Sequence, residues 1–342
     1  MIYPENVADI VLDILPETNW GMSTNIAAKY QTYPFYSGMW RKGNIKFTSG
    51  RSFRRNLTVD KTSSARKTPL FSTDVVTRKD LNKKIEVPFR TTEVSRAWDR
   101  REETITGGRE EIRDYLKDQA VGLSLERIEF IEDEGWILPT DENDPELIPS
   151  IRYWIRPERY NSADGFNGLA TIAGFPAGRG GLIHANHGNW AAQYVTADFD
   201  DLVKKIRRAM TRCHFRPPGP DMDMQGVPDW MIAAGYEDVI APLEELTRFQ
   251  NDRIGPDLAF YDGKVMIRNV PFVWVPALDA DPKKPVIGIN RHDFKIRISN
   301  DWFARRTKGM APSQHNVNMV WVEDMWGSTC DNLRSHFYLA TA

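Results

Sequence analysis

The sequence predicts a mixed α+β fold, and three features of its residue pattern lead to this class. Short segments that alternate apolar and polar residues, as half-buried strands do, lie in the N-terminal third and again in the C-terminal half. A single long helical pattern separates them. Strands and helices do not alternate in a regular βαβ repeat, so we do not expect the doubly wound parallel sheet of nucleotide-binding proteins.

The N-terminal third predicts a long antiparallel hairpin. Two alternating segments flank a polar tract at residues 60–67 that is rich in Ser, Thr and Lys. Their apolar positions are Ile45, Phe47 and Phe53 before the tract and Ile85, Val87 and Phe89 after it. A hairpin with so few apolar side chains is marginal in water by itself. It therefore needs a surface to lie on, and a neighbouring subunit is one candidate.

The strongest helical pattern follows at residues 109–131. The breaker Thr106-Gly107-Gly108 precedes it, and the acidic Glu110 and Glu111 suit the positive end of a helix. Apolar side chains then recur at spacings of three and four residues, at Ile112, Leu116, Ala120 and Leu123. At 1.5 Å per residue, this helix is expected to be roughly 35 Å long.

The C-terminal half predicts shorter elements. One helix is expected from the capping residue Asp198 through Leu202, Ile206 and Met210. A second is expected over residues 236–249, where Pro242 requires a helix start or a kink. Apolar and alternating runs predict strands at residues 153–155, 265–267, 272–275, 286–289, 294–298, 317–322 and 337–339.

The net charge of -2 hides two stretches of opposite sign. Residues 41–90 are strongly basic, whereas residues 126–146 are strongly acidic and contain Arg127 as their only basic residue. Charge runs of this kind can be two solvated faces. They can also be complementary surfaces that meet between copies of the protein, where opposite charges steer association and fix register.

Composition argues against several classes of protein. The balanced charge argues against binding nucleic acid chiefly by neutralising phosphates. Cys213 and Cys330 are too few for a disulfide framework and fit a reducing cytoplasm. Residues 1–19 lack the basic start of a signal peptide. No apolar run approaches the roughly 20 residues that span a bilayer, so we expect no membrane association.

Candidate catalytic and ligand-binding patterns are incomplete. The glycine-rich residues 178–181 lack both the GxGxxG spacing and the Lys-Ser/Thr of a phosphate loop. His184 and His187 have no third metal ligand at a matching spacing. The adjacent Cys213 and His214 point to different sides of a helix, and no GxSxG nucleophile motif is present. We therefore expect no catalytic residue, no cofactor and no metal ion.

Several short motifs follow one another along most of the chain. They are Gly43-Asn44-Ile45-Lys46-Phe47, Arg96-Ala97-Trp98, Leu182-Ile183-His184-Ala185-Asn186-His187, Phe215-Arg216-Pro217-Pro218, Gln250-Asn251-Asp252-Arg253 and Gln314-His315-Asn316-Val317. Together with the order of hairpin, long helix and α+β segment, they resemble the major capsid proteins of tailed bacteriophages, which have the Hong Kong 97-type fold.

The resemblance implies a division of the chain into parts. These are an N-terminal arm at residues 1–35, an extended β-hairpin loop at 36–95, a peripheral domain at 96–196 with the spine helix at 109–131, an axial domain at 197–298, and a segment at 299–342 that returns to the peripheral domain. It also implies the function. The subunit would assemble as hexamers and pentamers into the icosahedral head that encloses phage double-stranded DNA, with no enzymatic activity.

Partners follow from the same resemblance. The arm is too short for the cleaved scaffold segment of some members, which suggests a separate scaffolding protein. A portal and decoration or cement proteins are further partners, and packaged DNA would contact the inner surface without sequence specificity. The protein would be assembled in the host cytoplasm and end in the virion.

The two charged stretches provide a contact hypothesis for such a shell. Basic loop residues are expected to meet the acidic stretch of a neighbouring subunit. The residues proposed for this contact are Arg54, Arg55, Lys61 and Arg66 on one side and Glu132, Asp133 and Glu134 on the other.

Three other functions fit parts of the sequence. An encapsulin-like compartment has the same fold and encloses enzymes in place of DNA. A cytoplasmic enzyme would use the loop that contains His184 and His187, or the glycines at residues 178–181. A nucleic-acid-binding protein would use residues 41–90 and would bind with strong salt dependence.

Overall fold

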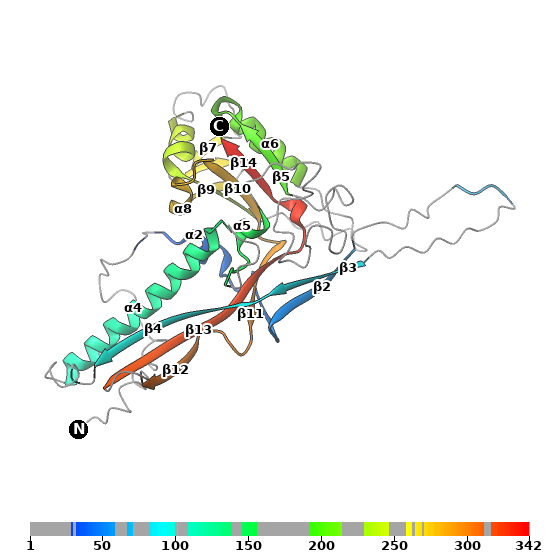
Figure 1. The fold of residues 1–342 in the computed structure, drawn as a ribbon. Helices are drawn as coiled ribbons and strands as arrows, with labels where there is room; N and C mark the ends of the chain where they lie inside the picture. Colours follow the sequence, from blue (N-terminus) through cyan, green and yellow to red (C-terminus); the bar gives the residue numbers. More distant parts are fainter. Residues whose placement is uncertain are drawn as a thin grey trace.

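The computed structural model describes residues 29, 32–58, 67–70, 82–99, 101, 109–138, 146–155, 192–213, 229–245, 258–261, 264–268, 270–310 and 316–341. They form a five-stranded sheet, a seven-stranded sheet and a two-stranded hairpin, with helices packed against the sheets (Figure 1). This mixture confirms the predicted α+β class.

The five-stranded sheet is built around β13 (Val317–Cys330). Along one edge, β4 (Arg90–Asp99) pairs antiparallel with the first part of β13. The other edge is shared by β12 (Arg305–Met310) and β11 (Phe294–Ser299), both antiparallel to β13. A parallel strand, β1 (Ile45–Thr48), lies beside β11. One long strand thus fixes the positions of segments that are far apart in the sequence.

The long helix α4 (Arg109–Trp136) runs along the ribbon of β4 and β13 (Figure 1). Ala120 and Leu123 are buried, as the apolar stripe predicts. The helix predicted at residues 109–131 is confirmed and extends for five further residues. Two short helices, α2 (Pro34–Met39) and α5 (Ile151–Trp154), pack against α4.

The seven-stranded sheet has the strand order β5-β14-β10-β6-β9-β8-β7. Its strands are β5 (Gln193–Ala197), β6 (Trp230–Ala234), β7 (Leu258–Tyr261), β8 (Lys264–Ile267), β9 (Val270–Trp274), β10 (Pro285–Asn290) and β14 (Phe337–Thr341). The helical segments around it are η1 (Phe199–Asp201), α6 (Leu202–Cys213), the π-helical turn η3 (Tyr236–Ile240), α8 (Pro276–Asp279) and η5 (Leu333–Ser335). The turn η3 continues as an α-helix to residue 245.

Central strands of this sheet are buried on both faces. In β6, Met231 and Ala233 join the core shared with α4 and α5, whereas Ile232 joins the core beneath α6 and η3. In β14, Tyr338 faces the first core and Phe337 the second. Because successive side chains in a strand point to opposite faces, both cores are filled from the same strands. The seven-stranded sheet is therefore the wall between the two cores.

The predicted hairpin is confirmed for β2 (Ser52–Thr58) and β3 (Asn82–Pro88), which pair antiparallel. The prediction that Ile45 and Phe47 belong to it was wrong, because β1 pairs with β11 in the five-stranded sheet. Gly50 has φ +100°, a conformation that glycine adopts without strain, and it lies where the chain leaves β1 for β2.

Six predicted strands are confirmed as β8, β9, β10, β11, β13 and β14. The strand predicted at residues 153–155 was wrong, because residues 151–154 form the helical turn α5. A short apolar run suits a buried turn as well as a strand, and Tyr153 and Ile155 are both fully buried here. The helix predicted from Asp198 is confirmed as η1 and α6, although the Asp198 side chain makes no capping hydrogen bond.

The division into arm, loop, peripheral and axial parts remains a proposal. Two strands bear on it. The strand β11, assigned above to the axial segment, lies in the five-stranded sheet beside β13. The C-terminal strand β14 lies inside the seven-stranded sheet, between β5 and β10.

A fully buried histidine lies between η5 and β14. His336 accepts a hydrogen bond at Nδ1 from the backbone N–H of Asn290 at 3.1 Å, and its ring packs edge-on against Phe294. Burial lowers the pKa of His336 to about 3. Since this lies below the ordinary value, His336 contributes stability that is complete above about pH 6.5 and is lost as the pH falls toward 3.

We predict that the free energy of unfolding falls below pH 6.5 with a contribution from His336 of up to about 1.4 kcal/mol per pH unit. In His336→Asn the amide oxygen can still accept from Asn290, but no group titrates. The variant should therefore be less stable at pH 7.5 and show a flatter pH dependence. Denaturant unfolding at pH 7.5, 6 and 5 measures both quantities. Parallel pH profiles for the two proteins would contradict this role.

Candidate subunit-contact site

The carboxylate of Glu132 holds α2 against α4. Backbone N–H groups of Phe35 and Tyr36 donate to its two oxygens at 3.0 and 2.8 Å, and Nε1 of Trp136 donates at 2.7 Å. The first N–H groups of a helix have no acceptor within the helix, so Glu132 supplies one to α2. Burial raises the pKa of Glu132, and these three hydrogen bonds oppose the rise.

Close approach of α2 to α4 depends on Gly135. A Cβ atom at this position would lie 2.3 Å from the ring of Phe35. Phe35 is fully buried and packs against Trp136 and Trp326, with ring centroids 6.2 and 6.1 Å away. The segment that precedes β1 is thereby fixed to the end of the long helix.

A buried ion pair ties α4 to β13. The guanidinium of Arg127 donates to both carboxylate oxygens of Asp324, at 2.5 and 2.9 Å. Asp324 is 1% exposed and also accepts from the backbone N–H of Ala304 at 2.7 Å. Ala304 has φ +47°, so this bond holds a left-handed turn ahead of β12. Helix, central strand and turn thus meet at one carboxylate.

Aromatic rings surround this ion pair. The Arg127 guanidinium lies 6.0 Å from the ring centroid of Trp40 and 5.7 Å from that of Phe303. Burial disfavours its charge, but the hydrogen bonds and charge of Asp324 outweigh this effect and raise the pKa of Arg127. Arg127 therefore stays charged.

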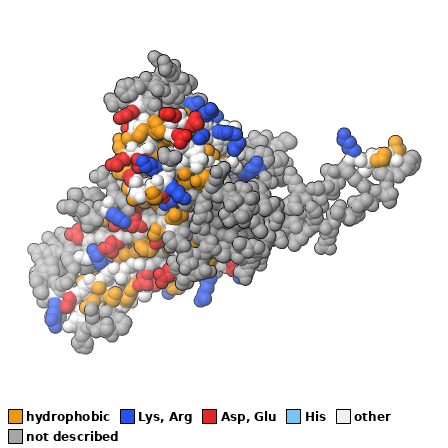
Figure 2. Space-filling view, turned by 45° about the horizontal axis from the view of Figure 1, so that its top comes forward, with side chains coloured by type: hydrophobic (Ala, Val, Ile, Leu, Met, Phe, Trp, Pro, Cys, Tyr) orange, Lys and Arg blue, Asp and Glu red, His pale blue; other side chains and the backbone are white. Residues whose placement is uncertain are grey.

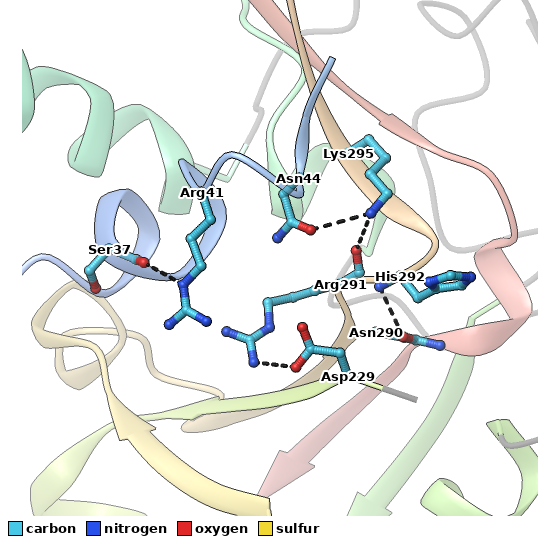
Figure 3. Close-up of polar contacts among 8 residues, drawn as sticks. All are labelled: Ser37, Arg41, Asn44, Asp229, Asn290, Arg291, His292 and Lys295. Carbon is cyan, nitrogen blue, oxygen red and sulfur yellow. Dashed lines mark hydrogen bonds and ion pairs between the residues drawn. The ribbon is translucent and has the colours of Figure 1, made fainter. Parts of the chain in front are cut away.

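The chain between α2 and β1 is anchored beside the turn that joins β10 to β11 (Figure 3). Nζ of Lys295 donates to Oδ1 of Asn44 at 3.3 Å and to the carbonyl of Arg291 at 3.1 Å. Arg291 in turn pairs with Asp229, at the start of β6. These bonds connect the chain just before β1 to both sheets.

Two sheet edges face solvent in the single chain. On β1, Phe47 is 54% exposed and touches the 42% exposed Phe303 edge-on, with ring centroids 5.5 Å apart. On β12, residues 305–308 are all exposed. Among the described residues, β1 and β12 are the two ends of the sheet's strand order, and strands at a sheet edge can pair with another chain.

No protein-family model and no curated protein matches the sequence. Solved structures match it at the level of the fold. The cyanophage A-1(L) capsid protein is 12% identical with a TM-score of 0.59, over 95% of this chain and 98% of that chain. The capsid of the empty GTA particle is 10% identical with a TM-score of 0.54, over 98% and 99%. The chain has the Hong Kong 97-type capsid fold.

A shell protein of a different kind shares this capsid fold. The SrpI encapsulin from Synechococcus elongatus is 12% identical with a TM-score of 0.52, over 96% of this chain and 94% of that chain. At these identities the likeness concerns the fold alone.

Within the capsid fold, the predicted basic contact residues belong to the hairpin. Arg54 is exposed and pairs with Glu86 across β2 and β3, at 2.9 Å. Arg55 lies on β2 opposite Ile85, and its side chain is outside the described residues, as are Lys61 and Arg66.

The acidic stretch is largely occupied by contacts within the chain. Glu126 pairs with Arg96 at 2.7 Å, and Asp133 pairs with Lys29 at 2.9 Å. Placing Glu132 at a subunit contact was wrong, because its side chain is buried beneath α2 with three internal donors. Asp133 and Glu134 remain partly exposed.

Sequence reasoning missed the structural importance of Arg127 and Asp324, although the pattern contains a signal for each. Val320, Val322, Asp324 and Trp326 occupy the same buried face of β13, so the charge interrupts an apolar alternation. Arg127 lies four residues after the buried Leu123 and is the only cation in the acidic stretch.

Three other kinds of feature would indicate a different function: a metal site, a reactive cysteine and a membrane-spanning helix. No group of three or more His, Cys, Asp or Glu side chains there could hold a metal ion, and residues 178–187 lie outside them. Cys213 faces the core, and burial raises its pKa to about 12, so it is a thiol at neutral pH. No helix within the described ranges is long and apolar enough to cross a membrane.

We predict that Asp324→Asn costs about 3–5 kcal/mol of unfolding free energy, because it leaves the largely desolvated Arg127 charge without its counter-ion. Denaturant unfolding followed by circular dichroism measures this loss. Asp301→Asn is the matched control, since Asp301 is exposed and should change stability by less than about 0.5 kcal/mol. Equal effects of the two substitutions would contradict the role of the Arg127–Asp324 pair.

Proposed function

We propose that this chain is the major capsid protein of a tailed bacteriophage and assembles as hexamers and pentamers into an icosahedral head around double-stranded DNA. One observation carries the proposal: the capsid fold extends over the whole architecture, covering at least 95% of this chain and 94% of each neighbour. A subunit of this kind works through repeated contacts with copies of itself and needs no cofactor. We propose no catalytic role for it.

The hairpin supports an assembly role. Its base is tied down by the buried Val87 and Phe89, and Arg297 lies 4.2 Å from the ring centroid of Phe53. Further along β2, Arg54 and Asn56 face solvent in the single chain. A hairpin with an anchored base and polar strands suits contact with a neighbouring subunit better than a role in its own core.

The proposed contact between the basic loop and an acidic stretch keeps its four basic residues but no longer includes the buried Glu132. We propose that Arg54, Arg55, Lys61 and Arg66 of one subunit face Asp133 and Glu134 of the next. The proposal further includes a separate scaffolding protein, a portal, decoration proteins and non-specific contact with packaged DNA, in a virion assembled in the host cytoplasm.

An encapsulin-like compartment is the second candidate, favoured by the likeness to the SrpI encapsulin over 96% of this chain. The two functions differ in what the shell encloses. Shells recovered from native sources should contain DNA if the chain is a phage capsid, and a protein cargo if it is a compartment.

We predict that the purified recombinant protein, alone or with its scaffolding protein, forms shells, tubes or megadalton rings. Negative-stain electron microscopy and light scattering detect them. A species that stays monomeric or dimeric in both preparations would contradict a shell function.

We predict that reversing the loop charges, with Arg54→Glu, Arg55→Glu, Lys61→Glu and Arg66→Glu, blocks assembly and leaves the helix content unchanged. The Arg54–Glu86 pair is exposed, so its loss costs the hairpin little. Adding Asp133→Lys and Glu134→Lys to the same chain should restore particles by electron microscopy. Normal shells from the loop variant alone would contradict the contact.

A further inference from the structure

Two helical segments pack on the same face of the seven-stranded sheet, over different strands. Helix α6 packs on β5 and β14, at one end of the strand order, whereas η3 contacts β9 and α8. In Figure 1 they lie on opposite sides of the upper part of the molecule. Figure 2 shows Lys and Arg side chains gathered at the upper right and Asp and Glu toward the upper left of this part.

The basic flank consists of the exposed Lys204, Arg208, Arg212 and Arg268. Helix α6 carries further basic residues on its less exposed positions and contains no acidic residue. Arg268, in the turn between β8 and β9, is fixed to this helix because its Nη1 donates to Oγ1 of Thr211 at 2.9 Å. At the start of α6, Lys205 faces Asp201 at 3.6 Å, which balances part of this charge.

The acidic flank consists of the exposed Glu237, Asp238 and Glu245, on η3 and the helical turn that follows. Lys284 neutralises part of this charge, since it pairs with Asp238 at 2.5 Å. Glu237 and Glu245 point outward from a segment whose opposite side, with Val239 and Leu243, is buried in the core.

An exposed aromatic pair lies beside the acidic flank. Tyr236 is 42% and Trp274 39% exposed, and their ring centroids are 6.1 Å apart. Asp279 holds both, because it accepts from the backbone N–H of Tyr236 at 2.6 Å and from Nε1 of Trp274 at 2.8 Å. Large rings that are exposed and already fixed in position are typical anchors of protein interfaces.

Each flank alone could be a solvated face. Their combination is informative, because the two flanks have opposite sign and are carried by different helical segments over different strands of one sheet. Two copies in a head-to-tail contact can bring the basic flank of one against the acidic flank of the next. Head-to-tail contacts of this kind close into rings when the rotation between copies allows it.

We propose that the basic flank of one subunit docks on the acidic flank and the Tyr236–Trp274 pair of the next, and that this contact builds the capsomer ring. The inference rests on the proposed shell function and adds the surfaces that join neighbouring subunits. Opposite charge on the two flanks fixes the direction in which subunits follow one another around the ring. The Tyr236–Trp274 pair supplies apolar area within each contact between two subunits.

The test uses two variants that each invert one flank. Lys204→Glu with Arg208→Glu and Arg212→Glu makes both flanks acidic, and Glu237→Lys with Glu245→Lys makes both flanks basic. Each variant alone should associate at least about tenfold more weakly than the wild-type chain, because like charges now face each other. Native mass spectrometry and light scattering of the full-length proteins measure the association.

Mixing the two variants provides the decisive measurement. Subunits with two acidic flanks and subunits with two basic flanks can only alternate, so the mixture should form rings with even numbers of subunits. It should therefore give six-membered rings, sheets or tubes, but no five-membered rings and no closed shells. A single chain with all five substitutions restores opposite flanks and should form both ring types.

The matched control preserves charge with Arg208→Lys and Arg212→Lys, and it should assemble as the wild type does. Single-flank variants that assemble normally would overturn the proposed contact while leaving the shell function intact. Folded variants that associate neither in the mixture nor in the five-substitution chain would overturn it as well. Failure of the wild-type chain to associate in any preparation would overturn both proposals.

Discussion

The buried pair of Arg127 and Asp324 is the interaction on which the architecture depends. Both charges lose their hydration when α4 lies on the ribbon of β4 and β13, and only a well-aligned pair with further donors offsets that cost. The bidentate geometry and the third donor at Ala304 meet this requirement. Sliding the helix along the ribbon would separate the charges, so the pair fixes the helix at one position on β13.

A second carboxylate extends this platform to the N-terminal segment. Glu132 gives α2 the acceptor that a short helix lacks, and Gly135 lets Phe35 enter the space that a side chain would occupy. Lys295 then fixes the chain just before β1. Residues that lead into the hairpin are therefore positioned before any neighbour binds, which reduces the entropy that an assembling subunit must lose.

Several charged residues that form runs in the sequence have their partners within the folded chain. The acidic stretch after Glu126 suggests a solvated or intersubunit face, yet Glu126, Glu132 and Asp133 have partners in the same chain. The basic helix α6 and the acidic η3 are separated by only 22 residues or so in the sequence, yet they pack over different strands of one sheet and contribute charges of opposite sign. Sequence distance thus says little about which charges face each other.

The sequence by itself determined the α+β class, the long helix and the antiparallel hairpin, because periodicity is a local property of the chain. It did not reveal β6, whose residues are buried on both faces and therefore show no alternation. Only the tertiary structure decided that β1 leaves the hairpin, that residues 151–154 turn as a helix, and that Glu132 is internal. Each of these depends on partners distant in the sequence: Ile296 for Ile45, Ser328 for Trp154, and the N–H groups of α2 for Glu132. Pairings of this kind are set by packing and hydrogen-bond satisfaction in the folded chain, which no local pattern contains.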